Sequence, residues 1–335
     1  MGILTFMDFC SGIGGGRLGL EQCHLKCVGH AEINHEALRT YELFFKDTYN
    51  FGDLMRINPN DLPDFDALIS GFPCQAFSIN GKRKGLEDER GTIIYGLIRI
   101  LKVKQPKCFL LENVKGLINH KQQETFKTII KALQEAGYTT YYQILNSADF
   151  QLAQKRERLY IVGFRKDLKH PFNFPLGLAN DYHFEDFLDA DNECYLDTNN
   201  AAFQRYLHNP YNHNRVFLEN ILTLENAVLD TRQSDLRLYF NVFPTLRTSR
   251  HGLFYTQKGK IKRLNAIESL LLQGFSRDLI AKIKDNPNFK ESHLLSQAGN
   301  AMSVNVIAAI AKQMLKAIQK GSFKGRVIPK YPLSP

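Results

Sequence analysis

The amino-acid sequence predicts an α/β fold: a mixed, mostly parallel sheet covered by helices and joined to a smaller, irregular second domain. Short apolar runs alternate with stretches of helical periodicity in the first half of the chain. The alternation breaks up after residue 165, and helical periodicity returns near residue 265. Ligands bind at the carboxyl ends of the strands in such sheets, so we expect the functional residues in the loops that follow the strands.

The expected strands are runs of about four to eight mostly apolar residues. They comprise residues 3–9, 26–33, 66–70, 108–112 and 160–164. Apolar residues recur at helical spacing in residues 36–45, 93–103, 123–136, 265–272 and 304–316. The return of helical periodicity indicates that the end of the chain rejoins the first domain.

The charge balance favours an anionic partner. Of the 335 residues, 43 are Lys or Arg and 34 are Asp or Glu, which gives a formal net charge of +9. Residues 232–263 contain eight basic residues, a single acid and several aromatic residues. Such a stretch suits contact with nucleic-acid phosphates, although a core stripe of aromatic residues with ordinary surface charges explains it equally well.

Cysteine usage and hydropathy indicate a protein of the reducing cytoplasm. The six cysteines are scattered, and the first residues lack the pattern of a secretory signal. Cys23 and Cys27 have no second ligand pair at regular spacing, so we expect no metal site. No apolar run approaches the ~20 residues that a membrane span requires.

A glycine-rich loop at residues 8–16 follows the first expected strand and precedes a helix, so its backbone N–H groups can bind a ligand. Arg17 stands where a dinucleotide fingerprint requires glycine. Glu32 ends the second strand and can accept from ribose hydroxyls, while Asp53 can accept from an adenine amino group. Without a phosphate-binding lysine, the set suits S-adenosylmethionine. A flexible turn with two surface acids is the alternative.

Three distant segments place complementary chemistry at one edge of the sheet. Cys74 lies in the loop after the third expected strand. Glu112 ends the fourth strand, and Arg156 and Arg158 precede the fifth. A thiol can attack, a carboxyl group can donate a proton and a guanidinium group can hold a carbonyl oxygen. A lone cysteine is commonly a core filler, but a loop position flanked by proline and glutamine favours a reactive one.

In their order along the chain, these segments resemble the motifs of the DNA (cytosine-5) methyltransferase family, and in particular the C5-methyltransferases of restriction-modification systems. The matching segments are residues 8–16, 32, 52–53, 73–75, 90–92, 112–114, 154–158, 263–275 and 297–300. Only residues 166–230 fall outside the resemblance, and there the family carries its variable target-recognition region.

The resemblance implies a Rossmann-like S-adenosylmethionine-dependent methyltransferase domain and a small, irregular target-recognition domain. The catalytic and cofactor-binding domain would comprise residues 1–165 and 297–322. Residues 166–260 would form the target-recognition domain and residues 261–296 a hinge segment. Residues 323–335 would be a loose tail.

The resemblance also implies a mechanism and partners. Cys74 would add to carbon 6 of a cytosine flipped out of duplex DNA, and carbon 5 would take the methyl group and leave S-adenosyl-L-homocysteine. Glu112, as the protonated acid, would bond ring nitrogen 3, and Arg158, with Arg156 nearby, would hold the base carbonyl and the loop. The enzyme would need no metal and act as a monomer on DNA. It would be cytoplasmic, prokaryotic or phage-encoded, and its product would resist a cognate restriction endonuclease.

The same resemblance assigns residues to the two ligands. The expected cofactor contacts are Asp8, Cys10, Gly12, Ile13, Gly15, Glu32, Ile33, Asp53, Leu54, Pro73, Ile93, Asn300 and Ala301. The expected DNA contacts are Gln75, Ser78, Asn80, Lys82, Arg83, Arg232, Arg237, Arg247 and Arg250. Cys10 and Ile33 stand where many members have aromatic residues against adenine, a departure that bears on cofactor affinity more than on the reaction.

Three competing hypotheses explain parts of the sequence. A relative that methylates cytosine in tRNA shares the fold but tends to replace the residue after the nucleophile, where this chain has Gln75. Residues 199–262 are also long enough for a DNA-recognition domain. A catalytically silent DNA-binding relative would usually lack Cys74 or Glu112, and a nicotinamide oxidoreductase gives these residues no common role.

Overall fold

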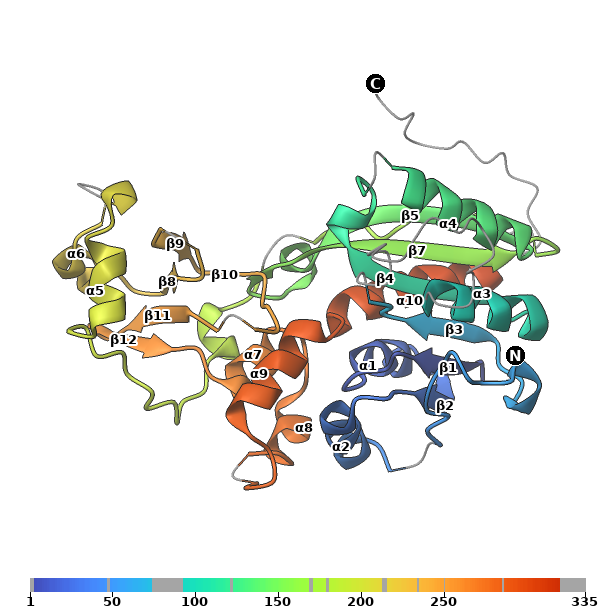
Figure 1. The fold of residues 1–335 in the computed structure, drawn as a ribbon, viewed down its shortest axis with the longest axis horizontal. Coiled ribbons are helices and arrows are strands. Elements are labelled where there is room, and N and C mark those ends of the chain that lie inside the picture. Colours follow the sequence, from blue (N-terminus) through green and yellow to red (C-terminus); the bar gives the residue numbers. More distant parts are fainter. Residues whose placement is uncertain are drawn as a thin grey trace, which may run out of the picture.

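The computed structural model describes residues 3–46, 49–73, 93–120, 123–168, 171–178, 181–212, 216–233, 235–249, 251–284 and 286–319. Figure 1 shows a large sheet with its helices at one end of the molecule and a smaller sheet at the other. Short helices from the last third of the chain lie between them (Figure 1).

Six strands form the large sheet, in the order β2 (Lys26–Ala31), β1 (Thr5–Phe9), β3 (Ala67–Ser70), β4 (Cys108–Val114), β7 (Glu157–Arg165) and β5 (Tyr138–Asn146). Neighbours from β2 to β4 pair in parallel, whereas β7 runs antiparallel to both β4 and β5. The predicted α/β class with a mixed, mostly parallel sheet is therefore confirmed. Because β7 runs in the opposite direction, its first residues lie at the edge where β1, β3 and β4 end.

Helices cover both faces of the large sheet, and successive strand residues point to opposite faces. α1 (Gly15–Glu21) and α10 (Val304–Gln319) pack together on one face, where Leu110 of β4 joins their apolar cluster. α3 (Ile93–Lys104) and α4 (Glu124–Glu135) contribute to the cluster on the other face, which receives Leu111. The end of the described chain thus returns to the first sheet, as expected from its helical periodicity.

The stretch Glu291–Gln319, which contains α9 (Glu291–Asn300) and α10, is long and apolar enough to cross a membrane by length and composition alone. However, 67% of its apolar window is buried inside the protein. Packing of α10 against the large sheet accounts for this apolar character.

The smaller sheet is antiparallel throughout, in the order β12 (Lys260–Arg263), β11 (Leu253–Gln257), β8 (Ala227–Asp230) and β9 (Arg237–Phe240). α5 (Ala201–Leu207) and α6 (Leu218–Thr223) pack on one face, in a cluster that includes Leu229 and Phe254. The last strand ends at residue 263, so it crosses the domain boundary expected at residue 260.

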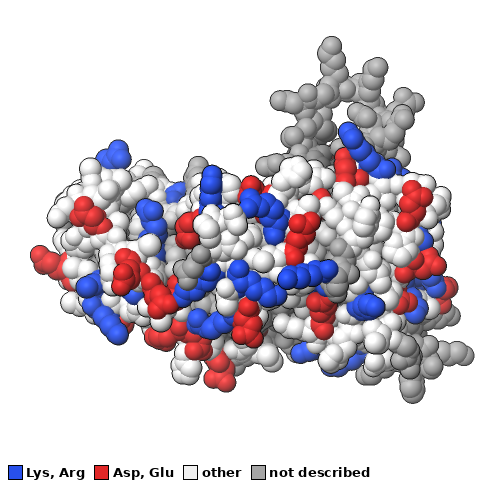
Figure 2. Space-filling model, turned by 90° about the horizontal axis from the view of Figure 1, so that it is seen from below, with Lys and Arg blue, Asp and Glu red and all other residues white. Residues whose placement is uncertain are grey.

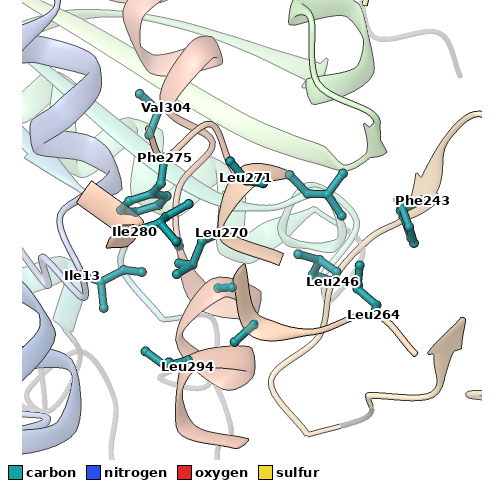
Figure 3. Close-up of a cluster of buried hydrophobic side chains, with 14 of the residues drawn as sticks. Ile13, Phe243, Leu246, Leu264, Leu270, Leu271, Phe275, Ile280, Leu294 and Val304 are labelled. Atoms are coloured by element: carbon teal, nitrogen blue, oxygen red, sulfur yellow. The ribbon is translucent and has the colours of Figure 1, made fainter. Parts of the chain in front are cut away.

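A shared core joins the two sheets. α2 (His35–Phe44), α7 (Ala266–Leu271), α8 (Arg277–Ala281) and α9 all contribute to it. Figure 3 shows Ile13 of the glycine loop converging on Leu270, Phe275 and Leu294. Two-residue strands β6 (Gln154–Lys155) and β10 (Phe243–Pro244) add a parallel pairing between the two halves.

Side-chain caps fix where several elements begin. The Asn34 side chain accepts a hydrogen bond from the Ala37 N–H at the start of α2. Asn265 and Glu268 form a reciprocal capping box at the start of α7. Short 3₁₀ turns occur at Pro59–Asp61, Lys115–Leu117, Ser147–Phe150, Phe184–Phe187 and Pro210–Asn212.

Candidate cofactor and catalytic site

A cavity of about 530 Å³ opens at the carboxyl edge of the large sheet, between the glycine loop, the end of β2 and α9. Its volume is within the range common for small-molecule sites. Most of the expected cofactor residues line it: Cys10, Gly12, Ile13, Glu32, Ile33, Asp53, Leu54, Pro73, Ile93, Asn300 and Ala301. Asp8 and Gly15 are the two expected residues that do not.

The Glu32 carboxylate is held in one orientation by backbone donors. Its Oε1 accepts from the N–H groups of Ile33 and Asn34, each at 2.8 Å, and its Oε2 accepts from the Gly12 N–H at 2.8 Å. These bonds tie the glycine loop to the end of β2. Asp53, in the next lining segment, accepts from the Met55 N–H at 2.9 Å. Two oriented carboxylates therefore line the cavity.

Asp8 and Gly15 are not among the residues that line the cavity, and their contact with the cofactor remains a prediction. Asp8 is fully buried, and no described donor is aligned with either of its carboxyl oxygens. Burial raises the pKa of Asp8 to about 8, although the charge of Arg17 acts in the opposite direction. A Cβ on Gly15 would lie 2.4 Å from the carbonyl oxygen of Met302, so glycine permits the close approach of α1 to the chain before α10.

Cys10 and Ile33 give the cavity aliphatic and thiol surfaces where the family resemblance implies aromatic ones. Burial raises the pKa of the Cys10 thiol to about 12, so this cysteine is a poor nucleophile. Ile33 is 65% exposed at the cavity rim and so remains open to contact with a ligand.

One face of α9 forms a cavity wall that the sequence interpretation only partly identified. His293, Ser296, Gln297 and Asn300 all line the cavity, at the spacing of one helical face. Gln297 also bridges to α2, because its Oε1 accepts from the Thr40 hydroxyl at 2.9 Å. The motif at residues 297–300 pointed to this helix, and extending its helical period backwards would have identified the earlier two residues.

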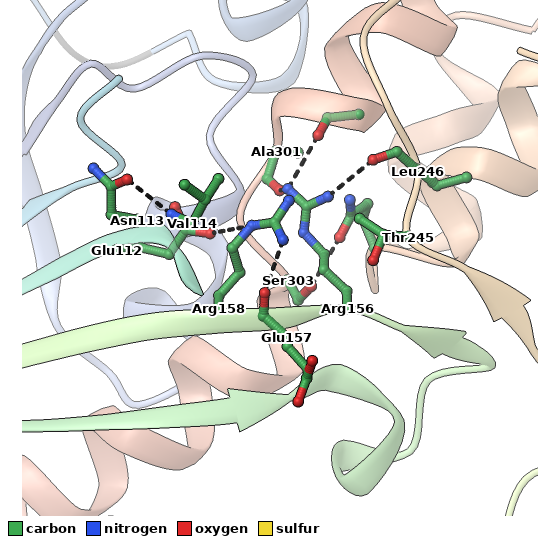
Figure 4. Close-up of polar contacts among 12 residues, drawn as sticks. Glu112, Asn113, Val114, Arg156, Glu157, Arg158, Thr245, Leu246, Ala301 and Ser303 are labelled. Atoms are coloured by element: carbon green, nitrogen blue, oxygen red, sulfur yellow. Dashed lines mark hydrogen bonds and ion pairs between the residues drawn. The ribbon is translucent and has the colours of Figure 1, made fainter. Parts of the chain in front are cut away.

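Glu112 and Arg158 form an ion pair at the same edge of the sheet. They come from the adjacent strands β4 and β7, and Arg158 Nε lies 3.1 Å from Glu112 Oε1 (Figure 4). Their side chains are only 10% and 13% exposed. No donor among the described residues is aligned for a hydrogen bond to Glu112 Oε1, although this atom is buried. The buried Glu112 carboxylate thus keeps unused hydrogen-bonding capacity.

The expected nucleophile, Cys74, lies outside the described residues, as do Gln75, Ser78, Asn80, Lys82 and Arg83. The two residues before it contact the sheet edge and the cavity. Asn113, next to Glu112, donates from Nδ2 to the Phe72 carbonyl oxygen at 2.8 Å, and Pro73 lines the cavity. The chain therefore reaches position 74 from a segment fixed to β4 and beside the cavity.

Arg156 stands two residues before Arg158 and is bound by backbone carbonyls of the protein, while its expected role beside the base and the loop remains a prediction. Its guanidinium group is buried and donates to the backbone carbonyls of Leu246, Gly299 and Ala301 (Figure 4). Burial lowers the pKa of Arg156 to about 9, and the nearby charge of Arg158 acts in the same direction. Arg156 is thus engaged by the protein's own backbone.

The expected DNA-binding arginines divide into three groups. Arg232 is 7% exposed and makes a buried ion pair with Asp230, which corrects the expectation that it faces DNA. Arg237 is half exposed and pairs with Asp235 at 3.0 Å, while Arg247 is exposed. Arg250 lies outside the described part of the chain. Proximity of basic residues in the sequence therefore did not predict which of them face solvent.

A buried polar network around Glu268 was missed by the sequence interpretation. Its carboxylate accepts from the Tyr255 hydroxyl at 2.6 Å, from Asn192 Nδ2 at 3.1 Å and from the Asn265 N–H at 2.9 Å. The network links α7 to β11 and to the chain that precedes α5. The Asn265-x-x-Glu268 spacing of a capping box was the available signal, although it does not reveal the distant partners.

Comparison with known proteins covers nearly the whole chain. The family model of the C-5 cytosine-specific DNA methylases matches residues 4–316. The Type II methyltransferase M.NgoBI of Neisseria gonorrhoeae is 38% identical over 318 residues, which cover 91% of each chain. M.Bsp6I, a Type II methyltransferase of a Bacillus species, is 35% identical over 332 residues, which cover 94% of this chain and 100% of the relative.

The structure is similar to that of S. pombe Dnmt2 methyltransferase, with a TM-score of 0.69, 18% identity, and coverage of 93% of this chain and 98% of that one. Such low identity supports the fold alone. The family model and the two bacterial relatives carry the assignment further: the model spans both the cavity wall and the Glu112–Arg158 pair, and each relative covers more than nine tenths of this chain. The chain is an enzyme, a methyltransferase, and it belongs to the C-5 cytosine-specific DNA methylase family.

Proposed function

We propose that this protein is a sequence-specific DNA (cytosine-5) methyltransferase of a restriction-modification system. It transfers the methyl group of S-adenosylmethionine to carbon 5 of a cytosine flipped out of duplex DNA. The observation that carries the proposal is the Glu112–Arg158 pair at the same sheet edge as the cavity, where Pro73 leads into Cys74. Membership of the family supports the same reaction.

The cavity fits an adenosyl ligand that carries an amino acid in place of phosphates. Glu32 and Asp53 offer carboxylate acceptors suited to ribose hydroxyls and an adenine amino group. None of the lining residues in the described chain is Lys or Arg, so no side-chain cation stands ready for a phosphate. S-adenosylmethionine, when bound, supplies a methyl group on a positively charged sulfur.

The side chains at the sheet edge suit attack on a pyrimidine ring. The Cys74 thiolate adds to carbon 6 and thereby places electron density on carbon 5. Glu112 holds a proton against ring nitrogen 3 and neutralises the charge that develops there, while Arg158 donates to the base carbonyl. Once carbon 5 is methylated, a base removes its proton, and the electron pair restores the ring double bond and expels the Cys74 thiol.

The target atoms are not accessible while cytosine is stacked, so the base must leave the helix. Figure 2 shows Lys and Arg side chains gathered across the middle of one face, between the two halves of the molecule, as an anionic duplex would require. Exposed Arg237 and Arg247 remain candidates for DNA contact. So do the loop residues Gln75, Ser78, Asn80, Lys82, Arg83 and Arg250.

The biological setting is proposed by analogy with the two bacterial relatives, both named Type II methyltransferases. We place this protein in the cytoplasm, encoded by a bacterium or phage, where its methyl mark protects DNA from a cognate restriction endonuclease. It acts as a monomer on DNA, with residues 166–260 as the target-recognition domain and residues 1–165 with 297–322 as the catalytic domain.

A product assay tests the proposal. The wild type and a Cys74→Ser variant are incubated with tritiated S-adenosylmethionine and unmethylated bacterial DNA, with tRNA as a second substrate, and the labelled nucleoside is identified. We expect 5-methylcytosine in DNA with the wild type only. Label confined to tRNA would replace the proposal with an RNA enzyme, and no label in either substrate would favour a catalytically silent relative.

A further inference from the structure

The strip formed by Gln154, Lys155 and Arg156 connects three parts of the molecule. It leads into β7 of the large sheet, and β6 pairs with β10 in the chain between β9 and β11. The Gln154 side chain is fully buried, accepts from the Leu246 N–H at 3.0 Å and donates to the Leu272 carbonyl at 3.0 Å. The strip therefore holds Leu246 from one side.

Gln154 accepts from the Leu246 N–H group, whereas Arg156 donates to the Leu246 carbonyl group. Arg156 also donates to the backbone at the wall of the cofactor cavity. Its Nη1 donates to the Leu246 carbonyl at 3.4 Å, while its Nη2 donates to the carbonyls of Gly299 and Ala301 at 3.0 and 2.9 Å. Ala301 lines the cavity. One buried guanidinium group thus joins the backbone of the 245–248 segment to the cavity wall.

The 245–248 segment itself is seated on the same junction. The Thr245 hydroxyl donates to the Lys155 carbonyl at 2.7 Å, and the Ser296 hydroxyl of α9 donates to the Thr248 carbonyl at 2.6 Å. A Cβ on Gly299 would lie 2.6 Å from the carbonyl carbon of Arg247, so the two backbones are in close contact. The segment also carries exposed Arg247, one of the candidate DNA contacts.

We propose that Arg156 is a positioning residue that couples DNA binding at the 245–248 segment to cofactor binding in the cavity. Any DNA contact that shifts the Leu246 carbonyl changes its bond to Arg156 and, through the same guanidinium group, the carbonyls of Gly299 and Ala301. A coupling of this kind is reciprocal, so each ligand tightens the binding of the other by the same factor. The inference rests on the proposed function, since it assumes that DNA is the second ligand.

The geometry requires arginine rather than any cation. Arginine presents its N–H groups in a planar fork of fixed shape, which lets Nη1 and Nη2 reach carbonyls on different segments simultaneously. A lysine ammonium keeps the positive charge but is a single centre on a flexible stem. Arg156→Lys therefore preserves charge while breaking the connection between the two segments.

The test measures the affinity of S-adenosylhomocysteine calorimetrically, with and without the unmethylated DNA of the product assay. We expect DNA to tighten wild-type binding about tenfold, within the usual range of coupling between sites, and the ratio to fall below about twofold in R156K. The matched control is Arg165→Lys at the far end of β7, because Arg165 also donates to a backbone carbonyl, that of Gln105, which lies in neither ligand segment. R165K should keep the wild-type ratio.

The outcomes separate coupling from a merely structural role. The inference would be overturned if R156K weakened cofactor binding equally with and without DNA. It would also be overturned if the wild type methylated DNA but DNA had no effect on its affinity for the cofactor. A wild type that does not methylate DNA would instead overturn the proposed function. If R156K does not fold, Thr245→Val, which removes the bond to the Lys155 carbonyl, should lower the ratio, and an unchanged ratio would count against the coupling.

Discussion

Each half of the molecule contains a buried arginine–carboxylate ion pair, and the two pairs differ in how completely their hydrogen-bonding groups are satisfied. Asp230 and Arg232 meet in a bidentate arrangement, with Nε and Nη2 at 2.7 and 2.8 Å from the two carboxylate oxygens, and Nη1 donates to the Thr245 carbonyl. Glu112 and Arg158 make a single contact at 3.1 Å that leaves the buried Glu112 Oε1 without an aligned donor. The satisfied pair stabilises the half with the smaller sheet, whereas the other pair keeps unused hydrogen-bonding capacity, as the proposed substrate-binding role of Glu112 requires.

The largest effect that this comparison predicts is on catalysis. Glu112→Gln keeps the shape of the side chain but removes the acid, so kcat should fall by about 10²- to 10⁴-fold. The melting temperature should fall less than after the loss of Arg232, because glutamine keeps an oxygen acceptor beside Arg158 and the 3.1 Å contact is not an aligned hydrogen bond. Steady-state methylation and thermal unfolding measure the two quantities. If the variant melted at a much lower temperature while its folded fraction stayed fully active, Glu112 would have a structural role and not a catalytic one.

The corresponding change in the other pair should affect stability. Arg232→Met leaves Asp230 buried without its partner, so the free energy of unfolding should drop by about 3–5 kcal/mol in urea titrations. The double variant R232M/D230L removes both charges and should recover much of that loss. If R232M were as stable as the wild type but bound DNA poorly, Arg232 would face DNA after all.

The pKa values of two buried carboxyl groups, those of Asp230 and Asp8, extend this comparison. Burial works to raise the pKa of Asp230, but hydrogen bonds from Arg232 outweigh it and hold the pKa below its usual value. At Asp8 burial outweighs the opposing influence of Arg17 and raises the pKa of the carboxyl group to about 8. In the unfolded chain the pKa of Asp8 is near its ordinary value of 3.8, so the unfolded state binds fewer protons than the folded state between pH 3.8 and about pH 8. Asp8 should therefore cost stability as pH rises towards 8.

Asp8→Asn removes this titration. Relative to the wild type, the variant should gain unfolding free energy between pH 5 and pH 8, as measured by urea titration at each pH. A wild type whose stability relative to the variant does not change over that range would show that folded Asp8 is ionised throughout.

The smallest predicted effect concerns exposed Arg237, whose side chain is 45% exposed beside Asp235. If it contacts phosphate, Arg237→Ala should weaken DNA binding modestly and lower the salt dependence of log Kd by up to about one unit of slope. Affinities measured at several KCl concentrations give that slope. Lys258→Ala, which alters a different exposed basic residue, shows what a general loss of one positive charge does.

The sheet edge that carries Glu32 and Glu112 could be predicted from the sequence, because its position depends only on where each apolar run ends. Glu32 and Glu112 each stand where an apolar run stops, and parallel strands bring such positions to one edge without further information. The antiparallel strand β5 was not expected. Its segment contains Thr139, Thr140 and Gln143 on a partly exposed surface, so no apolar run marks it.

The half with the smaller sheet could not be predicted in the same way, because its polar residues depend on distant partners. Arg232 looked like a phosphate contact since nothing in its spacing shows that Asp230 and the Thr245 carbonyl surround it. Arg156 has the motif position of a catalytic residue, yet its bonds go to carbonyls 90 to 145 residues away. Long-range backbone acceptors leave no local pattern in a sequence.

Trapping of Cys74 on DNA tests the central claim most directly. In DNA containing 5-fluorocytosine, carbon 5 lacks the hydrogen that a base must remove, so the thiol cannot leave after methylation. We predict a complex that survives denaturation, forms only with S-adenosylmethionine, and carries the nucleotide on Cys74 by peptide mass spectrometry, while Cys74→Ser forms none. A complex through another residue, or an active enzyme that is never trapped, would contradict the account.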